Sequence, residues 1–370
     1  MTSSAKTNKA PAKGYYERDS IAQMQGYVWG EQPQHSDIVK LNTNENPYPP
    51  SPAVAEALAN FDPSALRTYP NPTADPLRQA LATHHNLTRE NVVLTHGGDE
   101  ALRLAITTFV DAGETLGIAT PSYSLYPVLA TIQDAKICSI PLRADYALPS
   151  HFADAMQRAD VKLTLVVNPH APSGQLTPLE QLRELAEAVP GVLLIDEAYV
   201  DFVDPAQNYD SSSLLNERDN VLIMRTFSKG YSLAGMRLGY LLGAANLIKP
   251  IIEKTRDSYN IDALSQAIGL AAIQDQAYAE STWSAVRGLR DALYAALLQR
   301  GFGGPSSQTN FLFMDVPATG PSALAIYQSL KKQNILVRYF EHESTATKLR
   351  FSVGTAAQNT ALLAALDALL

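Results

Sequence analysis

The sequence has very little cysteine. Cys138 is the single cysteine among 370 residues, so no disulfide can form within the chain. Cysteine-poor chains are typical of reducing compartments, and neither a secretory signal nor a long apolar run is present. We therefore expect a cytoplasmic protein with no membrane segment. Cys138 itself lies in an apolar, strand-like stretch, where packing is the simplest explanation.

An excess of basic charge is also missing. The chain has 29 Lys and Arg residues against 37 Asp and Glu, a net charge of −8, and the basic residues are scattered. This pattern disfavours nucleic acid or an acidic membrane as a partner. No Gly-x-Gly-x-x-Gly motif follows the first strand of the repeating pattern, which disfavours a nicotinamide cofactor. We expect no metal.

The apolar content is 46% of the residues, enough for one large and one smaller core. From about residue 91, short all-apolar stretches alternate with helical ones, which is typical of a mostly parallel sheet covered on both faces. Three further strand-like stretches follow a long helical region, and they predict a smaller α+β unit. The fold class is thus α/β with a second, smaller α+β domain. The strands are expected at 92–95, 116–119, 163–167, 192–195, 221–224 and 238–242, then at 310–315, 335–338 and 349–353.

The same pattern predicts the domain organisation. Residues 1–20 are polar and aperiodic, which indicates a mobile tail. Residues 21–50 form an amino-terminal arm, which ends in a stretch rich in proline and asparagine at 41–50. Residues 51–262 make the large domain, and residues 263–370 make the small one.

One lysine is a candidate nucleophile. Lys229 follows the buried strand 221–224 and lies among small and hydroxyl residues, with Ser228 before it and Arg237 eight positions later. A desolvated lysine becomes a usable amine toward an aldehyde. A hydroxyl and a guanidinium suit a phosphate monoester. Together they suggest pyridoxal 5'-phosphate. The alternative is an ordinary loop lysine at the end of a strand.

Other polar residues also stand at strand ends, where ligands bind in parallel sheets. The turn at Gly98 and Asp99 opens a helix and could hold an anion, although Asp99 is also an ordinary helix-start residue. Tyr123 could stack on a planar ring, or be a half-buried loop tyrosine. Asp196 could face a pyridine nitrogen, with Tyr199 near the ring oxygen, or could be a cap or ion pair.

Two arginines stand in the predicted small unit. Arg338 and Arg350 lie on strand-like stretches and suit an anionic group of the substrate. A surface position is the usual alternative for arginine.

These motifs resemble one known family. The chain is similar to the fold-type-I, pyridoxal-phosphate-dependent aminotransferases, and within them to the histidinol-phosphate aminotransferases. The resemblance covers nearly everything after residue 21. It rests on Leu41-Asn42-Thr43-Asn44-Glu45-Asn46-Pro47-Tyr48, Arg67-Thr68-Tyr69-Pro70, Gly98-Asp99-Glu100, Tyr123, Asn168-Pro169-His170-Ala171-Pro172-Ser173-Gly174, Asp196-Glu197-Ala198-Tyr199, Ser228-Lys229, Ala234-Gly235-Met236-Arg237, Val337-Arg338 and Arg350-Phe351-Ser352-Val353-Gly354-Thr355.

The resemblance implies a role for each matching residue. Lys229 would bond covalently to the cofactor and later move the proton between the substrate and the cofactor. Asp196 would pair with the ring nitrogen, and Tyr199 would contact the ring oxygen. The remaining implied contacts are ring stacking by Tyr123, further cofactor contact by Asn168, phosphate binding by Gly98, Asp99, Ser228 and Arg237, and substrate binding by Tyr27, Arg338 and Arg350.

The resemblance also implies a homodimer. Tyr69 of one subunit would reach the cofactor phosphate of the other. The expected reaction converts histidinol phosphate and 2-oxoglutarate to imidazole acetol phosphate and glutamate. The alternatives are an aromatic amino acid aminotransferase, a decarboxylase of a phosphorylated amino acid, and a cofactor-binding regulatory protein without turnover. In the enzyme readings the partners are an amino donor and a 2-oxo acid.

One position departs from the family. Ala171 stands where the family has an asparagine that donates to the ring oxygen. Losing one hydrogen bond to a charged oxygen costs at most about 1.5–3 kcal/mol. Tyr199 could carry the donation alone, or His170 or Asn168 could reach in.

Overall fold

The apolar stretches that alternate with helices in the sequence form a seven-stranded sheet. The computed structural model describes residues 16–33, 37–342 and 345–370. The strand order is β2-β8-β7-β6-β5-β3-β4. All neighbouring pairs are parallel except those of β8, which is antiparallel to β2 and β7. The strands are β2 (Val92–Thr95), β3 (Thr115–Thr120), β4 (Lys136–Pro141), β5 (Val161–Val167), β6 (Val192–Asp196), β7 (Val221–Thr226) and β8 (Gly239–Gly243).

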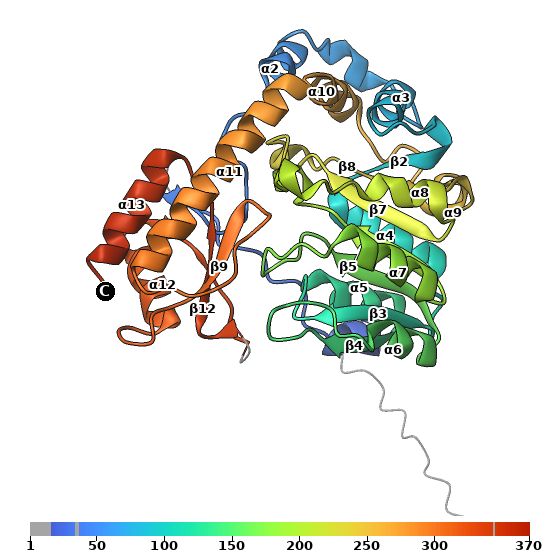
Figure 1. The fold of residues 1–370 in the computed structure, drawn as a ribbon. Helices are drawn as coiled ribbons and strands as arrows, with labels where there is room; N and C mark the ends of the chain where they lie inside the picture. Colours follow the sequence, from blue (N-terminus) through green and yellow to red (C-terminus); the bar gives the residue numbers. More distant parts are fainter. Residues whose placement is uncertain (1–15, 34–36, 343–344) are drawn as a thin grey trace, which may run out of the picture.

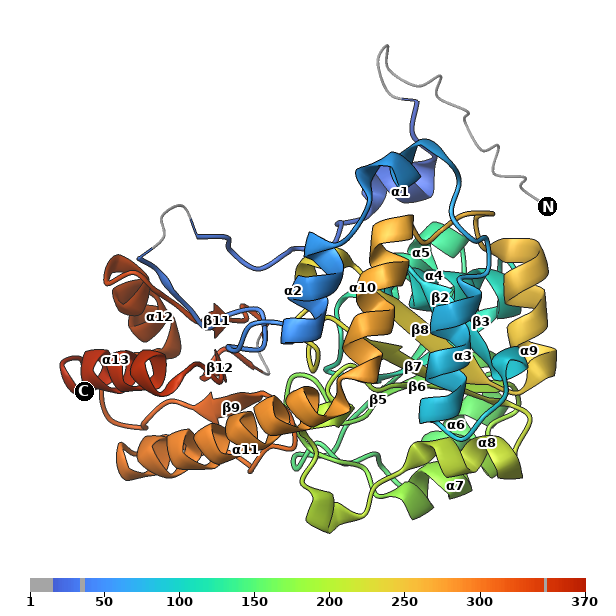
Figure 2. The ribbon, with the colours of Figure 1, turned by 90° about the horizontal axis from the view of Figure 1, so that it is seen from above.

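Helices cover both faces of this sheet (Figures 1 and 2). Successive residues of a strand point to opposite faces, so Leu193 and Ile195 pack into one apolar core while Leu194 packs into the other. Buried strands of this kind read as continuous apolar runs. Helices α3 (Asp75–His84), α6 (Phe152–Arg158), α7 (Leu179–Ala188), α8 (Leu214–Glu217) and α10 (Ala263–Gln274) lie in the first core, whereas α4 (Gly97–Phe109), α5 (Leu125–Gln133) and α9 (Ala245–Pro250) lie in the second.

A smaller unit follows along α11 (Gln276–Gln299), which runs from beside α10 of the large unit to the small unit in Figure 1. Ala279, near its start, packs in the large core, while Leu293 and Leu297 pack in the small one. The small sheet has the antiparallel order β11-β12-β9. Its elements are β9 (Phe311–Asp315), α12 (Ala323–Lys332), β11 (Arg338–Tyr339), β12 (Lys348–Ser352) and α13 (Ala356–Asp367). The predicted combination of an α/β unit with a smaller α+β unit is confirmed.

The strand predicted at 335–338 is divided in two. β10 (Ile335–Leu336) pairs with β1 (Val39–Lys40) of the arm, and after Val337 the chain continues as β11 in the other sheet. An apolar run shows that strand residues are buried, but it does not show which strand they pair with. This pairing ties the arm to the small unit.

The arm begins with α1 (Asp19–Gln23) and ends before α2 (Pro52–Ala59), whose amino end is capped by Ser51. Most of the predicted tail, residues 1–15, lies outside the described residues. The domain boundaries at 50 and 262 stay predictions. Among the described residues, no helix is both long and apolar enough to cross a membrane.

Candidate active site

The carboxyl ends of the parallel strands bring the predicted residues to one edge of the sheet. Asp196 is the last residue of β6, and Lys229 lies three residues beyond β7. Tyr123 follows β3 and Asn168 follows β5 directly. β2 is antiparallel to β8, as β7 is, so β2 runs in the direction of the parallel strands and brings Gly97 to the same edge.

The amine of Lys229 is held by the arm. Its Nζ donates to the carbonyl oxygen of Thr43 at 2.8 Å. Burial lowers the pKa of this lysine from 10.5 to about 8. The charge of Glu45 opposes that shift, whereas Arg350 and Arg237 add to it. A useful fraction of the amine is therefore neutral near neutral pH, as a nucleophile requires.

The anion cradle is built around Gly97. Its φ is +76°, and a Cβ there would lie 2.6 Å from Nη2 of Arg237. The guanidinium thus lies directly against the backbone at the start of α4, where free N–H groups and the helix dipole favour an anion. Arg237 Nη1 donates to Ser228 Oγ at 3.2 Å, and its Nη2 lies 3.5 Å from Asp99 Oδ2. The structure brings Gly98, Asp99, Ser228 and Arg237 together.

Asp196 lies on the floor of the site. The residue is 3% exposed, its Oδ2 accepts from the Tyr126 hydroxyl at 2.7 Å, and its Oδ1 accepts from the Ala198 N–H at 3.2 Å. Burial raises its pKa from 3.8 to about 6, against the effect of these hydrogen bonds. Such a carboxylate has a strong need for a cationic partner. The Tyr123 hydroxyl donates to Asp99 Oδ1 at 3.2 Å, and the Tyr123 ring is edge-on to that of Tyr126 at 5.6 Å.

Tyr126 is a residue that sequence reasoning missed. It lies in an apolar helix and is fully buried, so nothing in the pattern separates it from an ordinary core tyrosine. A polar atom in such a helix must find a partner inside the protein, and here that partner is Asp196.

Asn168 and His170 are not available to replace the family asparagine. The Asn168 side chain faces Thr177, donating to its carbonyl oxygen at 3.1 Å and accepting from its N–H at 2.7 Å. His170 Nε2 pairs with the carbonyl oxygen of Pro121 at 2.9 Å, and its Nδ1 with Ser173 Oγ at 2.7 Å. Burial lowers the pKa of His170 to about 4, so the ring is neutral and both nitrogens are occupied. These contacts disfavour the alternatives in which either side chain reaches the ring oxygen, because both side chains hold the loop in shape.

Two arginines face each other in the small sheet. Arg338 and Arg350 are direct partners across the antiparallel strands β11 and β12, and both guanidinium groups lie over Phe340, at 5.4 and 5.5 Å. Like charges in this position repel unless an anion lies between them. Arg350 Nε is buried and has no hydrogen-bond partner among the described residues. The charge of Arg350 also helps to lower the pKa of Lys229.

The two remaining predicted tyrosines differ in position. Tyr27 lies in the site, edge-on to Tyr123 at 5.7 Å. Tyr69 is 81% exposed and stacks on Tyr259 at 4.5 Å, on the outer surface. The structure therefore does not bring Tyr69 to the cradle of its own chain.

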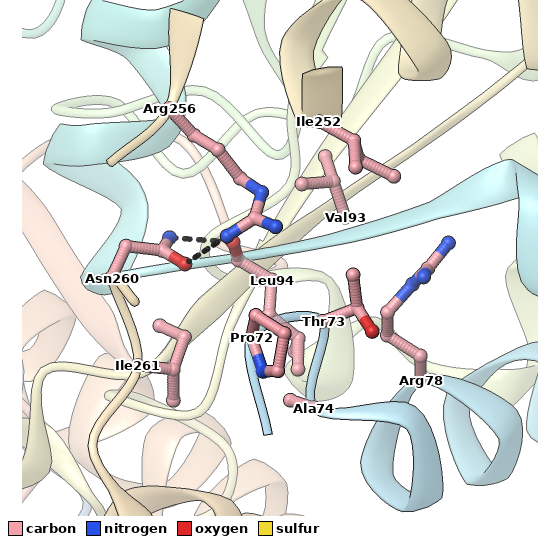
Figure 3. Close-up of a pocket in the computed structure, with 10 residues that line it drawn as sticks. All are labelled: Pro72, Thr73, Ala74, Arg78, Val93, Leu94, Ile252, Arg256, Asn260 and Ile261. Atoms are coloured by element: carbon pink, nitrogen blue, oxygen red, sulfur yellow. Dashed lines mark hydrogen bonds between the residues drawn. The ribbon is translucent and has the colours of Figure 1, made fainter. Parts of the chain in front are cut away.

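A separate hollow lies on the α3 side of β2 and contains none of the predicted site residues (Figure 3). In it Arg256 Nη1 donates to Asn260 Oδ1 at 3.1 Å. Asn260 Nδ2 in turn donates to the carbonyl oxygen of Leu94 and to Glu100 Oε2, each at 3.0 Å. These bonds fix the end of β2 and the start of α4 from behind, which supports the turn at Gly97.

The residues present fit pyridoxal 5'-phosphate. The cradle that a Cβ at Gly97 would fill suits a phosphate, and the buried Asp196 carboxylate suits a pyridinium nitrogen. The amine of Lys229 would take the aldehyde. No cluster of three or more metal-binding side chains occurs among the residues that the structure describes.

The fold and this set of residues define a pyridoxal-phosphate-dependent enzyme of the α/β class. Comparison with known proteins supports this class. Residues 36–366 match the family described as aminotransferase class I and II. The chain belongs to this family, and the predicted membership is confirmed.

Its relatives narrow the class further. Histidinol-phosphate aminotransferase 1 of Trichormus variabilis is 40% identical over 96% of this chain and 99% of its own length. Histidinol-phosphate aminotransferase 2 of Psychrobacter arcticus is also 40% identical, over 93% of this chain and 92% of its own. The crystal structure of histidinol-phosphate aminotransferase from Sinorhizobium meliloti, in complex with pyridoxal 5'-phosphate, superposes with a TM-score of 0.88 at 25% identity, covering 96% of this chain and 98% of that one.

Proposed function

We propose that this protein is a pyridoxal-phosphate-dependent histidinol-phosphate aminotransferase. It transfers the amino group of histidinol phosphate to 2-oxoglutarate, giving imidazole acetol phosphate and glutamate. The observation that carries the proposal is the pair Arg338 and Arg350, directly opposite each other, with the charge of Arg350 helping to lower the pKa of Lys229. Both substrates carry an anionic end, a phosphate in histidinol phosphate and a carboxylate in 2-oxoglutarate, which such a pair suits. The relatives that are 40% identical over nearly full length support the choice of histidinol phosphate.

The bound cofactor supplies an aldehyde that bonds to amines and a ring that accepts the electron pair left when substrate Cα loses its proton. Gly98, Asp99, Ser228 and Arg237 hold the phosphate. Asp196 would keep the ring nitrogen protonated, while Tyr123 would cover the ring and Tyr199 would donate to its oxygen. The contacts described above support the roles of the cradle, Asp196 and Tyr123, and the family resemblance supports that of Tyr199.

Lys229 moves the proton. Its Nζ is held by the carbonyl oxygen of Thr43, and its lowered pKa leaves the free amine able to accept a proton from Cα. Arg338 and Arg350 would hold the anionic end of the substrate, so that its Cα proton faces the amine of Lys229. Tyr27 lines the substrate pocket beside Tyr123.

We also propose that the active unit is a cytoplasmic homodimer. The exposed apolar side chains of Trp29, Leu58, Leu66 and Tyr69 all lie in the amino-terminal part of the chain, and burying them in a subunit interface would remove them from water. In this dimer Tyr69 reaches the phosphate of the cofactor in the partner subunit.

A substrate panel tests the proposed function. We expect the purified protein with cofactor and 2-oxoglutarate to form glutamate faster from histidinol phosphate than from phenylalanine or threonine phosphate. Carbon dioxide released from threonine phosphate would favour a decarboxylase. Higher kcat/KM with phenylalanine would favour an aromatic aminotransferase. A change of cofactor absorbance without any product would contradict turnover.

The lowered pKa of Lys229 predicts the pH dependence of cofactor loading. Only the neutral amine attacks an aldehyde, so in the cofactor-free protein the loading rate should rise with pH through about 8 and level off above it. The measurement is the absorbance change after rapid mixing with pyridoxal 5'-phosphate from pH 6 to 9.5. A rate still rising tenfold per pH unit between 8.5 and 9.5 would place the pKa near that of an ordinary lysine and contradict the assignment.

Replacing Arg350 tests the anion site. Arg350→Gln should raise the KM for 2-oxoglutarate by about 10- to 100-fold, because a charge-assisted hydrogen bond contributes about 1.5–3 kcal/mol. Cofactor affinity should change little. The matched control is Arg300→Gln, which removes a guanidinium paired with Asp367 on the surface of the small unit. An unchanged KM in Arg350→Gln would show that the substrate anion binds elsewhere.

A further inference from the structure

The missing asparagine at position 171 leaves Tyr199 as the side chain expected to serve the ring oxygen. Ala171 is buried, and Asn168 and His170 are occupied in the loop. A tyrosine hydroxyl has one proton, and that proton can point in several directions. A lone donor is effective only if something else fixes its direction.

Asn44 of the arm contacts that hydroxyl. Its Nδ2 lies 3.1 Å from the Tyr199 hydroxyl oxygen. The direction of the amide is fixed, because Ser352 Oγ donates to Asn44 Oδ1 at 3.0 Å while accepting from the Asn44 N–H at 2.9 Å. The NH₂ group must therefore face Tyr199. A hydroxyl oxygen that accepts a hydrogen bond keeps its own proton for another acceptor, and its donor strength rises.

The placement of Asn44 is costly, which indicates that the arm holds it in a defined position. Its φ is +57°, and the residue is 1% exposed. Its carbonyl oxygen accepts from Asn310 Nδ2 at 2.9 Å. The preceding residue, Thr43, holds the Lys229 amine. Asn44 thus joins the small unit to two groups of the site.

We propose that Asn44 is a positioning residue that turns the proton of the Tyr199 hydroxyl toward the cofactor ring oxygen, in place of the direct donor lost at Ala171. The proposal rests on the proposed function, since it requires a bound pyridoxal 5'-phosphate. It does not depend on which amino donor is used.

The test is a spectroscopic titration of the bound cofactor without substrate. A hydrogen bond donated to the ring oxygen withdraws negative charge from that oxygen. The oxygen then stabilises less strongly the proton on the Lys229 nitrogen that is bonded to the cofactor, so the pKa of this nitrogen is lower. Losing the donor should therefore raise this pKa. Asn44→Gly removes the amide and accepts the positive φ without strain. We expect the pH midpoint of the cofactor absorbance to rise by about one unit in this variant. We expect kcat to fall by about 3- to 10-fold.

A control separates this role from simple anchoring of the arm. Asn310→Ala removes a hydrogen bond that holds Asn44 but leaves the contact with Tyr199, so its midpoint should stay at the wild-type value. A midpoint in Asn310→Ala that moves as far as in Asn44→Gly would overturn the proposal, because loosening of the arm would then explain both.

A second variant tests the link with position 171. Ala171→Asn placed on Asn44→Gly should return the midpoint toward the wild-type value, since it supplies the direct donor. A double variant that folds, as judged by its thermal unfolding, yet keeps the full shift would contradict the replacement of one donor by the other. An unshifted midpoint in Asn44→Gly overturns the role of Asn44 alone, whereas a wild-type protein that shows no cofactor absorbance overturns the proposed function.

Discussion

Lys229→Ala should lower the rate of transamination by about 10⁴-fold, the upper end of what a general base contributes. The substitution removes both the amine that bonds to the cofactor and the base that moves the proton. The neighbouring arginines, Arg350 and Arg237, cannot take its place, because a guanidinium does not release a proton near neutral pH. The measurement is a single-turnover assay of glutamate formation together with the absorbance of the bound cofactor.

Lys229→Arg separates the charge of the lysine from its chemistry. The variant keeps a cation beside Glu45 but has no neutral form. We expect it to be as inactive as Lys229→Ala, while both variants still bind the cofactor through the cradle around Gly97 and Arg237. Activity within tenfold of wild type in either variant would show that Lys229 is not the base. Loss of all cofactor binding in both variants would show that the cradle alone does not hold the phosphate.

The strand-end rule explains why much of the site could be predicted from the sequence. Lys229, Asp196 and Tyr123 each follow an apolar run, and parallel strands carry such residues to one edge of the sheet. The same apolar runs predict that the sheet is buried on both faces, with one apolar core on each. These inferences need only the order of the elements along the chain.

The contacts between distant segments could not be predicted in this way. Asn44 meets Tyr199 across 155 positions of sequence, and Ser352 meets Asn44 across 308. Neither residue has a local pattern that reveals its partner. Asn168 shows a different limit, since the resemblance implied a cofactor contact for this strand-end residue, whereas its side chain pairs with the backbone of Thr177. Position at the edge of the sheet is thus a weaker guide for small amides, which often pair with nearby backbone.

Asp196→Asn should lower kcat/KM by about 150- to 5,000-fold. The carboxylate is 3% exposed, and removing one partner of a buried ion pair costs about 3–5 kcal/mol. An amide has nearly the same shape but cannot keep the ring nitrogen protonated, so the ring accepts less of the electron pair from Cα. The measurement is the rate of the first half-reaction, followed by cofactor absorbance after mixing with histidinol phosphate. Tyr126→Phe removes one hydrogen bond from Asp196 but keeps the charge of the carboxylate. In this variant kcat/KM should fall by only a few-fold.

Although Asp196→Asn should lower activity, it should not lower the stability of the cofactor-free protein. Burial raises the pKa of Asp196 from 3.8 to about 6, so ionising this carboxyl lowers the stability of the cofactor-free fold progressively from about pH 4 to 6, and the full cost remains above that window. Asp196→Asn removes the cost, and the unfolding temperature of the cofactor-free variant at pH 8 should equal or exceed that of wild type. With cofactor bound, wild type should be the more stable of the two, since only its carboxylate meets a pyridinium. A variant less stable than wild type in both states would show that Asp196 holds the fold together, and its loss of activity would then say nothing about the ring nitrogen.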